Sequence, residues 1–187
     1  DTAMPKWDFL RDREIKDMVA YLARPRNVTP SLAAMQAAAK QPDAAKQGTH
    51  VFRSRCGSCH GVSAEGGIGS SLNTSEFLGL ASDAFIHKTV TEGRRGTAMG
   101  AWSHLSAKEL GRILAYLRAF PQGTVRSPAG KAVASESKGR INFERTCVAC
   151  HGSDGRGLIG PAIGNHDFLD AVDDQFLRET IRYGRMG

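Results

Sequence analysis

The feature that most constrains this chain is a five-residue motif that occurs twice. It contains all four cysteines, in the segments Cys56-Gly57-Ser58-Cys59-His60 and Cys147-Val148-Ala149-Cys150-His151. Two thiols three positions apart on one helical turn can form thioethers to both vinyl groups of one porphyrin, and the next residue then places its imidazole under the iron. The motif therefore predicts two covalently attached c-type haems, through Cys56/Cys59 and Cys147/Cys150.

Other uses of paired cysteines explain the motif less well. Disulfides and zinc sites built from two C-x-x-C knuckles do not require a histidine directly after both second cysteines. The glycine-rich run at 155–160 has the G-x-G-x-x-G spacing of a phosphate loop. It follows a haem motif rather than a β-strand, so the nucleotide interpretation lacks its structural context.

Charge and hydropathy exclude two further classes. The formal charge of +6 is spread along the chain without the dense basic run of a nucleic-acid surface, and the propionates of two haems would offset much of it. We therefore expect no nucleic-acid partner. No apolar run approaches the length of a transmembrane helix, so no transmembrane segment is expected. The absence of a secretory signal at the start indicates a mature form or an internal piece.

The surroundings of the first motif resemble the class I cytochrome c family. Gly48 and Phe52 have the Gly-x-x-x-Phe spacing of that family's first helix, and Met99 stands where the family carries its distal methionine. Ser106-x-x-Glu109 then forms a capping box before a helix with apolar residues at spacings of three and four.

That resemblance implies an all-α fold and assigns roles to individual residues. His60 and Met99 would be the axial ligands of the first iron, and Trp102 would pack the haem. At the second motif, His151 would bind the iron, and the carbonyl of Pro161 would accept a hydrogen bond from it, fixing its tautomer. Ser70 takes the corresponding place in the first copy.

An internal repeat shows that the second copy is only half a domain. Residues 48–96 align with 139–187 without a gap, so the second copy stops before its distal methionine. The other half matches the start of the chain, because Thr2-Ala3-Met4-x-x-Trp7 repeats Thr97-Ala98-Met99-x-x-Trp102. We therefore expect Met4 to bind the iron above His151 and Trp7 to pack that haem.

Three arrangements would bring these halves together, and the sequence leaves all three open. The chain could close on itself as a circular permutation, or exchange its N-terminal segment with a neighbour. It could also be a window from a longer string of domains, in which Met4 serves an earlier haem.

The resulting organisation has two class I cytochrome c domains, the second assembled from both ends of the chain. The segments are the C-terminal half of a domain, a linker, a complete domain, a second linker and the N-terminal half of a domain: 1–26, 27–45, 46–120, 121–137 and 138–187. Met18 is expected to be a core residue in an apolar helical stripe with Ile15, Val19 and Leu22, and Met35 is expected in the first linker.

The predicted function is one-electron transfer between redox partner proteins, as a carrier, a wire or the haem subunit of a larger oxidoreductase, rather than enzymatic catalysis. Basic residues near the first haem could steer an acidic partner: Lys88, Arg94, Arg95 and Lys108. The alternative is a dihaem enzyme, such as a peroxidase or thiosulfate-oxidising cytochrome, with one open haem site. The resemblance implies the periplasmic or extracellular face of a bacterial membrane.

Overall fold

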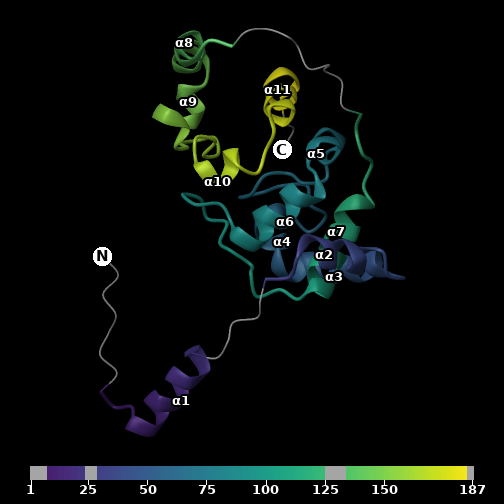
Figure 1. The fold of residues 1–187 in the computed structure, drawn as a ribbon, viewed down its shortest axis with the longest axis vertical. Helices are drawn as coiled ribbons and strands as arrows, with labels where there is room; N and C mark the ends of the chain where they lie inside the picture. Colours follow the sequence, from purple (N-terminus) through teal and green to yellow (C-terminus); the bar gives the residue numbers. More distant parts are fainter. Residues whose placement is uncertain (1–7, 24–28, 125–133, 185–187) are drawn as a thin grey trace.

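The chain folds into helices joined by loops. The computed structural model describes residues 8–23, 29–124 and 134–184, and within these ranges it contains helices and no β-strand, which confirms the all-α prediction (Figure 1). The helices are α1 (Asp12–Ala23), α2 (Leu32–Ala39), α3 (Ala44–Arg55), α4 (Gly57–His60), α5 (Ser75–Leu80), α6 (Asp83–Glu92), α7 (Ala107–Arg118), α8 (Glu136–Thr146), α9 (Val148–His151), the short 3₁₀ turn η1 (Ser153–Gly155), α10 (His166–Leu169) and α11 (Asp174–Tyr183).

The first domain is built on the crossing of α3 and α7. Helix α7 begins with the predicted capping box, in which Ser106 and Glu109 satisfy each other's backbone N–H groups. Its apolar stripe is buried, and Gly48 of α3 lies so close to the backbone of Arg112 on α7 that a Cβ atom would overlap the Arg112 carbonyl oxygen. A glycine at the crossing thus lets the two backbones approach closely.

The segment predicted as a linker contributes to this core. Ser31 caps α2 by accepting a hydrogen bond from the N–H of Ala34, and α2 packs along α7. Met35 is 1% exposed within the core cluster. The alanine-rich run in the predicted linker 27–45 suggested a short helix, which α2 confirms, but the packing of this helix into the core was not predicted.

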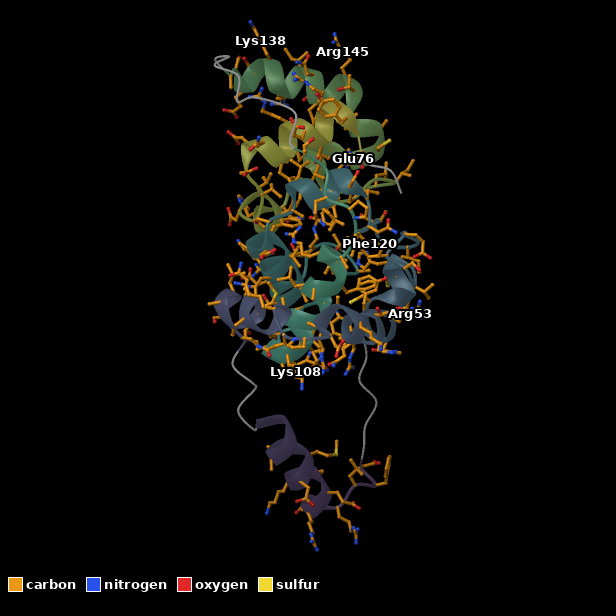
Figure 2. The ribbon with its side chains drawn as sticks, turned by 90° about the vertical axis from the view of Figure 1, so that its right-hand side faces the viewer. Arg53, Glu76, Lys108, Phe120, Lys138 and Arg145 are labelled. Atoms are coloured by element: carbon orange, nitrogen blue, oxygen red, sulfur yellow. The ribbon has the colours of Figure 1, made fainter. Side chains whose placement is uncertain are left out.

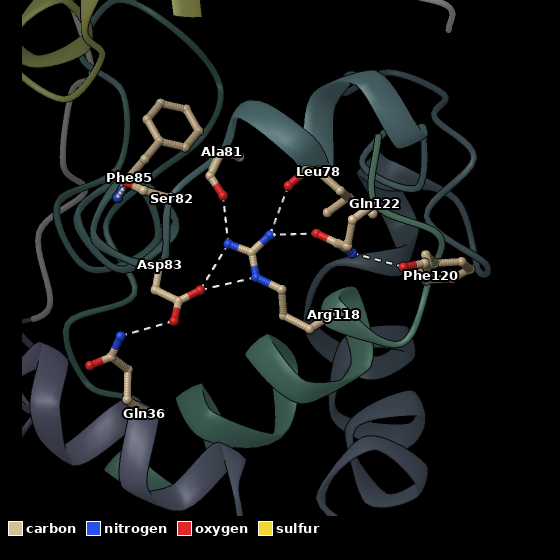
Figure 3. Close-up of polar contacts among 9 residues, drawn as sticks. All are labelled: Gln36, Leu78, Ala81, Ser82, Asp83, Phe85, Arg118, Phe120 and Gln122. Carbon is tan, nitrogen blue, oxygen red and sulfur yellow. Dashed lines mark hydrogen bonds and ion pairs between the residues drawn. The ribbon is translucent and has the colours of Figure 1, made fainter. Parts of the chain in front are cut away.

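A single arginine ties the end of α7 to the loop between α5 and α6. The Arg118 guanidinium donates to the carbonyls of Leu78 and Ala81 at 2.9 and 2.5 Å and to the Asp83 carboxylate at 2.8 and 3.0 Å (Figure 3). Gln36 of α2 donates to the other oxygen of Asp83 at 2.9 Å. These contacts fix α2, α6 and α7 relative to one another.

The second segment repeats helices α3 to α6 of the first domain, but its first helix, α8, is not packed into a core as α3 is. α5 and α6 are capped by Thr74 and Ser82, and α10 and α11 by Asn165 and Asp173 at the aligned positions. No residue of α8, the counterpart of α3, is buried, although the structure describes this helix in full. At Gly139, the counterpart of Gly48, an added Cβ would have no described atom within 4 Å.

Helix α1 is the sequence counterpart of α7, yet it lies apart from α8. The two helices are at opposite ends of the molecule, where Lys138 and Arg145 of α8 mark one end and α1 the other (Figures 1 and 2). Ile15, Met18 and Val19 are 43%, 52% and 57% exposed, so the prediction that Met18 is a core residue is wrong for this structure. An amphipathic stripe can be read from sequence, but the surface that covers it cannot.

Each of the two segments contains a pair of packed phenylalanines, and one residue of each pair contacts the other segment. Phe77 and Phe85 have ring centroids 6.1 Å apart at 75°, and their counterparts Phe168 and Phe176 repeat this geometry at 6.2 Å and 73°. Phe85 and Phe176 meet in the middle, 5.2 Å apart. Since each partner in the central contact is the repeat of the other, the interface has approximate two-fold symmetry.

Candidate haem-binding sites

Both motif histidines are held by a backbone carbonyl at the same relative position. His60 Nδ1 lies 2.8 Å from the carbonyl oxygen of Ser70, and His151 Nδ1 lies 2.9 Å from that of Pro161. A carbonyl can only accept, so Nδ1 carries the hydrogen and the lone pair of Nε2 remains for a metal. The hydrogen bond predicted for His151 is confirmed, and the serine in the first copy makes the same bond.

The loop after each motif follows one backbone pattern. Two of its repeated hydrogen bonds agree within 0.1 Å between the copies. Gly66 N lies 2.8 Å from His60 O and Gly157 N lies 2.7 Å from His151 O, while Gly69 N lies 2.8 Å from Cys59 O and Gly160 N lies 2.7 Å from Cys150 O. Gly66 and Gly157 both adopt positive φ, +102° and +94°, which favours glycine. The two loops thus have nearly the same conformation despite different side chains.

A glycine lies directly against each imidazole. A Cβ added at Gly69 would be 2.8 Å from Cε1 of His60, and one added at Gly160 would be 3.0 Å from Cε1 of His151. The ring is therefore confined by the loop on one side and by its carbonyl acceptor. This cradle fits a haem whose proximal ligand is the motif histidine. The sequence signal for it was the pair of aligned glycines.

The cysteines are consistent with attachment sites and not with the alternatives. All four are unpaired, with Cys56 and Cys147 half-buried and Cys59 and Cys150 exposed. Within the described part of the chain, no group of three or more His, Cys, Asp or Glu side chains could hold a metal ion, so the zinc interpretation finds no support. Burial, and then the nearby Cys59, raise the pKa of the Cys56 thiol to about 11 against the opposing charge of Arg55, unlike an activated catalytic cysteine.

The loop that carries Met99 is anchored at both ends. Met99 is half-buried, its carbonyl accepts from the N–H of Arg94 at 2.9 Å, and the N–H of Trp102 donates to Val90 of α6 at 2.9 Å. Trp102 packs against the core. Met4 and Trp7, which the sequence predicts at the second haem, lie outside the described residues.

Comparison with known proteins shows what the first domain is similar to. The family described as cytochrome c oxidase, cbb3-type, subunit III matches residues 43–117. Cytochrome c55X of Stutzerimonas stutzeri is 44% identical over 71 residues, covering 37% of this chain and 62% of that protein. Residues 43–117 are therefore similar to a cytochrome c domain. Such a domain implies covalently bound haem c and electron transport.

Longer matches cover about three quarters of the chain. Cbb3-type cytochrome c oxidase subunit CcoP of Cereibacter sphaeroides is 29% identical over 161 residues, 77% of this chain and 53% of that protein. The same subunit of Rubrivivax gelatinosus is 29% identical over 150 residues, 78% of this chain and 45% of that protein. The chain thus spans about half the length of these curated relatives.

One solved structure is similar to part of the chain, and the described helices show whether any could span a membrane. A solved structure of cytochrome CL from Methylophaga aminisulfidivorans is 29% identical over 46% of this chain and 58% of that one, but its TM-score of 0.39 carries no argument about the fold. Among the described helices, none combines the length and apolar character needed to cross a bilayer.

The rim charges expected near the cytochrome c domain's haem do not form one surface. Lys108 and Arg95 are exposed, as a steering role requires. Arg94 is half-buried against the second segment, and its Nη2 approaches the Ala162 carbonyl at 3.5 Å. Arg94 therefore differs from the expectation of a solvated rim charge. The sequence could not reveal this, because the burial arises between segments.

Proposed function

We propose that this protein is a dihaem c-type cytochrome that transfers single electrons between redox partners as part of a larger oxidase of the cbb3 kind. The observation that carries the proposal is the duplicated proximal cradle. Both motif histidines have the same carbonyl acceptor position, the same glycine against the ring and the same loop hydrogen bonds. A second motif without a cofactor would have no reason to keep this geometry.

Each part of the chain has a defined task in this function. Haem c supplies an iron that gains and loses one electron. Cys56/Cys59 and Cys147/Cys150 form the thioethers, while His60 and His151 present Nε2 as the proximal ligand. The carbonyls of Ser70 and Pro161 keep each ring in one tautomer and orientation. Met99 is the distal ligand of the first iron, and Trp102 helps to exclude water.

The distal ligand of the second iron is assigned to a methionine equivalent to Met99, and Met4 is the candidate in this chain. Two features indicate that α8 requires a crossing helix equivalent to α7. Leu110, Ile113 and Leu114 of α7 are buried, and their counterparts on α1 are an equally apolar stripe without cover. Gly139 on α8 keeps the small residue that a crossing helix requires. Closure within one chain, exchange between chains and a longer multi-domain chain all satisfy this requirement.

The relatives support the setting of the proposal. Two of them are named as cbb3-type oxidase subunits and one as cytochrome c55X. We assign the protein to the periplasmic face of a bacterial membrane, where c-type haems are attached. Its redox partners are proteins, and the exposed Arg95 and Lys108 suit a partner with an acidic docking surface.

The test is a haem count on the chain produced with c-type maturation. Two haems per chain are expected, falling to one in the double variant Cys56→Ala/Cys59→Ala and to one in Cys147→Ala/Cys150→Ala. A redox titration should then resolve two reversible one-electron steps. One haem per wild-type chain, or a second site that binds carbon monoxide and turns over peroxide, would contradict the proposal.

A further inference from the structure

Arg94 lies on the first domain but contacts the proximal loop of the second segment. Its guanidinium carbon is 4.4 Å from the centre of the Phe168 ring, and its Nη2 is 3.5 Å from the carbonyl oxygen of Ala162. Ala162 directly follows Pro161, whose carbonyl accepts from His151. The side chain of Arg94 is thus separated by one peptide unit from the group that orients the second proximal histidine.

The same residue also anchors the distal loop of its own domain. Its N–H donates to the carbonyl of Met99 at 2.9 Å, and its carbonyl accepts from the hydroxyl of Thr97 at 2.7 Å. The backbone of Arg94 therefore belongs to one haem site and its side chain to the other.

The guanidinium has less polar compensation than its burial requires. Nε is buried and has no hydrogen-bond partner among the described residues, and no described carboxylate pairs with Arg94. Burial also lowers the pKa of Arg94. An arginine has five N–H donors, and a buried cation is costly unless an anion or several acceptors face it. The neighbouring Arg95 is different, because its exposed Nε pairs with Asp167 at 3.0 Å.

We propose that Arg94 is a cross-domain component of the haem site around His151. Its guanidinium stacks on Phe168, braces the Ala162–Ile163 peptide next to the Pro161 carbonyl and leaves Nε to donate to an anionic group of that haem, a propionate carboxylate. The inference rests on the proposed second haem. A positive charge near an iron favours the ferrous state, because reduction lowers the positive charge of the site. Arg94 thus raises the reduction potential of the haem that His151 binds.

The experiment uses the complete holo chain and begins with its haem count. Redox titrations are then compared for wild type, Arg94→Gln, Arg94→Lys and the matched control Arg95→Gln. The control removes the same charge one residue away, where it is exposed. The one-electron step of the second haem is identified as the step that remains in the titration of Cys56→Ala/Cys59→Ala. Thermal unfolding is recorded for every variant.

We expect Arg94→Gln to lower the potential of the haem at His151 more than that of the haem at His60. Arg94→Lys should cause a smaller shift in the same direction, because charge is kept but the Nε donor is lost. Arg95→Gln should leave both potentials nearly unchanged. A shift in Arg94→Gln no larger than in Arg95→Gln, or confined to the haem at His60, overturns the proposal.

Two further outcomes are also decisive. If Arg94→Gln does not accumulate as a holo protein, Arg94→Lys decides alone, and an unchanged second potential in that variant overturns the proposal. A wild-type count of one haem overturns the proposed function and this inference together, whereas two haems with the wrong potential pattern overturn this inference only.

Discussion

The two haem-motif segments agree closely around the histidine and differ in what covers the preceding helix. In both, a carbonyl ten residues after the histidine accepts from its Nδ1 at 2.8–2.9 Å. In the first, α7 lies across α3 at Gly48, while in the second no described atom approaches the Cβ direction of Gly139. The cradle is thus encoded within a short stretch of chain, whereas the core requires a helix from a distant segment.

The largest expected difference in stability is between matched truncations on α7 and on its sequence counterpart α1. Leu110 is 1% exposed, and Leu110→Ala is expected to cost about 3–4 kcal/mol of unfolding free energy through lost burial and a cavity. Ile15→Ala, at the aligned position on α1, should change the free energy by less than about 1 kcal/mol, because Ile15 is already 43% exposed. Denaturant titration of the holo proteins measures both. A cost for Ile15→Ala that approaches that of Leu110→Ala would mean that α1 packs in a completed domain.

The next effect concerns the glycines of the paired helices. In Gly48→Ala the new Cβ meets the backbone of Arg112, so we expect a loss of about 2–3 kcal/mol. In Gly139→Ala the space is open, and the higher helix propensity of alanine should add up to about 1 kcal/mol. Thermal unfolding gives the sign of each change. Destabilisation by Gly139→Ala would indicate that another helix crosses α8 at this glycine.

The sequence predicted the local part of both sites and missed contacts made across long separations. The resemblance to the class I cytochrome c family implied the hydrogen bond between His151 and Pro161, and ten residues of loop separate the two partners. Helical periodicity likewise predicted the stripe on α7. By contrast, the burial of Met35 depends on α2 docking against α7, more than seventy residues later. Periodicity identifies an apolar face but contains no information about its partner.

A third, smaller difference in stability is expected between two arginines. Arg118 forms a clamp in the first domain, holding Leu78, Ala81 and Asp83, whereas Arg140 forms an exposed ion pair in the second segment. Arg118→Gln removes charged donors from the carbonyls of Leu78 and Ala81 and from Asp83, with an expected cost of about 2 kcal/mol. The control is Arg140→Gln, which breaks the exposed i,i+4 pair with Glu144 and should change the stability much less, because solvent screens this pair. Equal costs would show that the clamp in Figure 3 adds nothing beyond a surface pair.

The same clamp predicts a dependence on acid. Burial alone would raise the pKa of Asp83, but hydrogen bonds from Gln36 and Arg118 and the charge of Arg118 hold it below its ordinary value of 3.8. A carboxyl with a lowered folded-state pKa stabilises the fold above its unfolded-state pKa, and this contribution is lost as pH falls through the folded value. Asp83→Asn should therefore reduce the loss of stability between these two pKa values, as measured by denaturation at a series of acid pH values. An unchanged acid slope would contradict this account.

The smallest effect should be the same in both segments, because it concerns the cradle that they share. In Gly69→Ala and Gly160→Ala the new Cβ would lie 2.8 and 3.0 Å from the histidine ring, so each ring must tilt by a few tenths of an ångström. A cost of about 1 kcal/mol is expected for each, since a ring can yield where a backbone cannot. The tilt should also shift the absorption spectrum and potential of the haem beside the altered glycine. Ser70→Ala keeps the carbonyl acceptor for His60 and serves as the control. If only Gly69→Ala has an effect, the second histidine is not held against a haem, and the two segments differ in function as well as in cover.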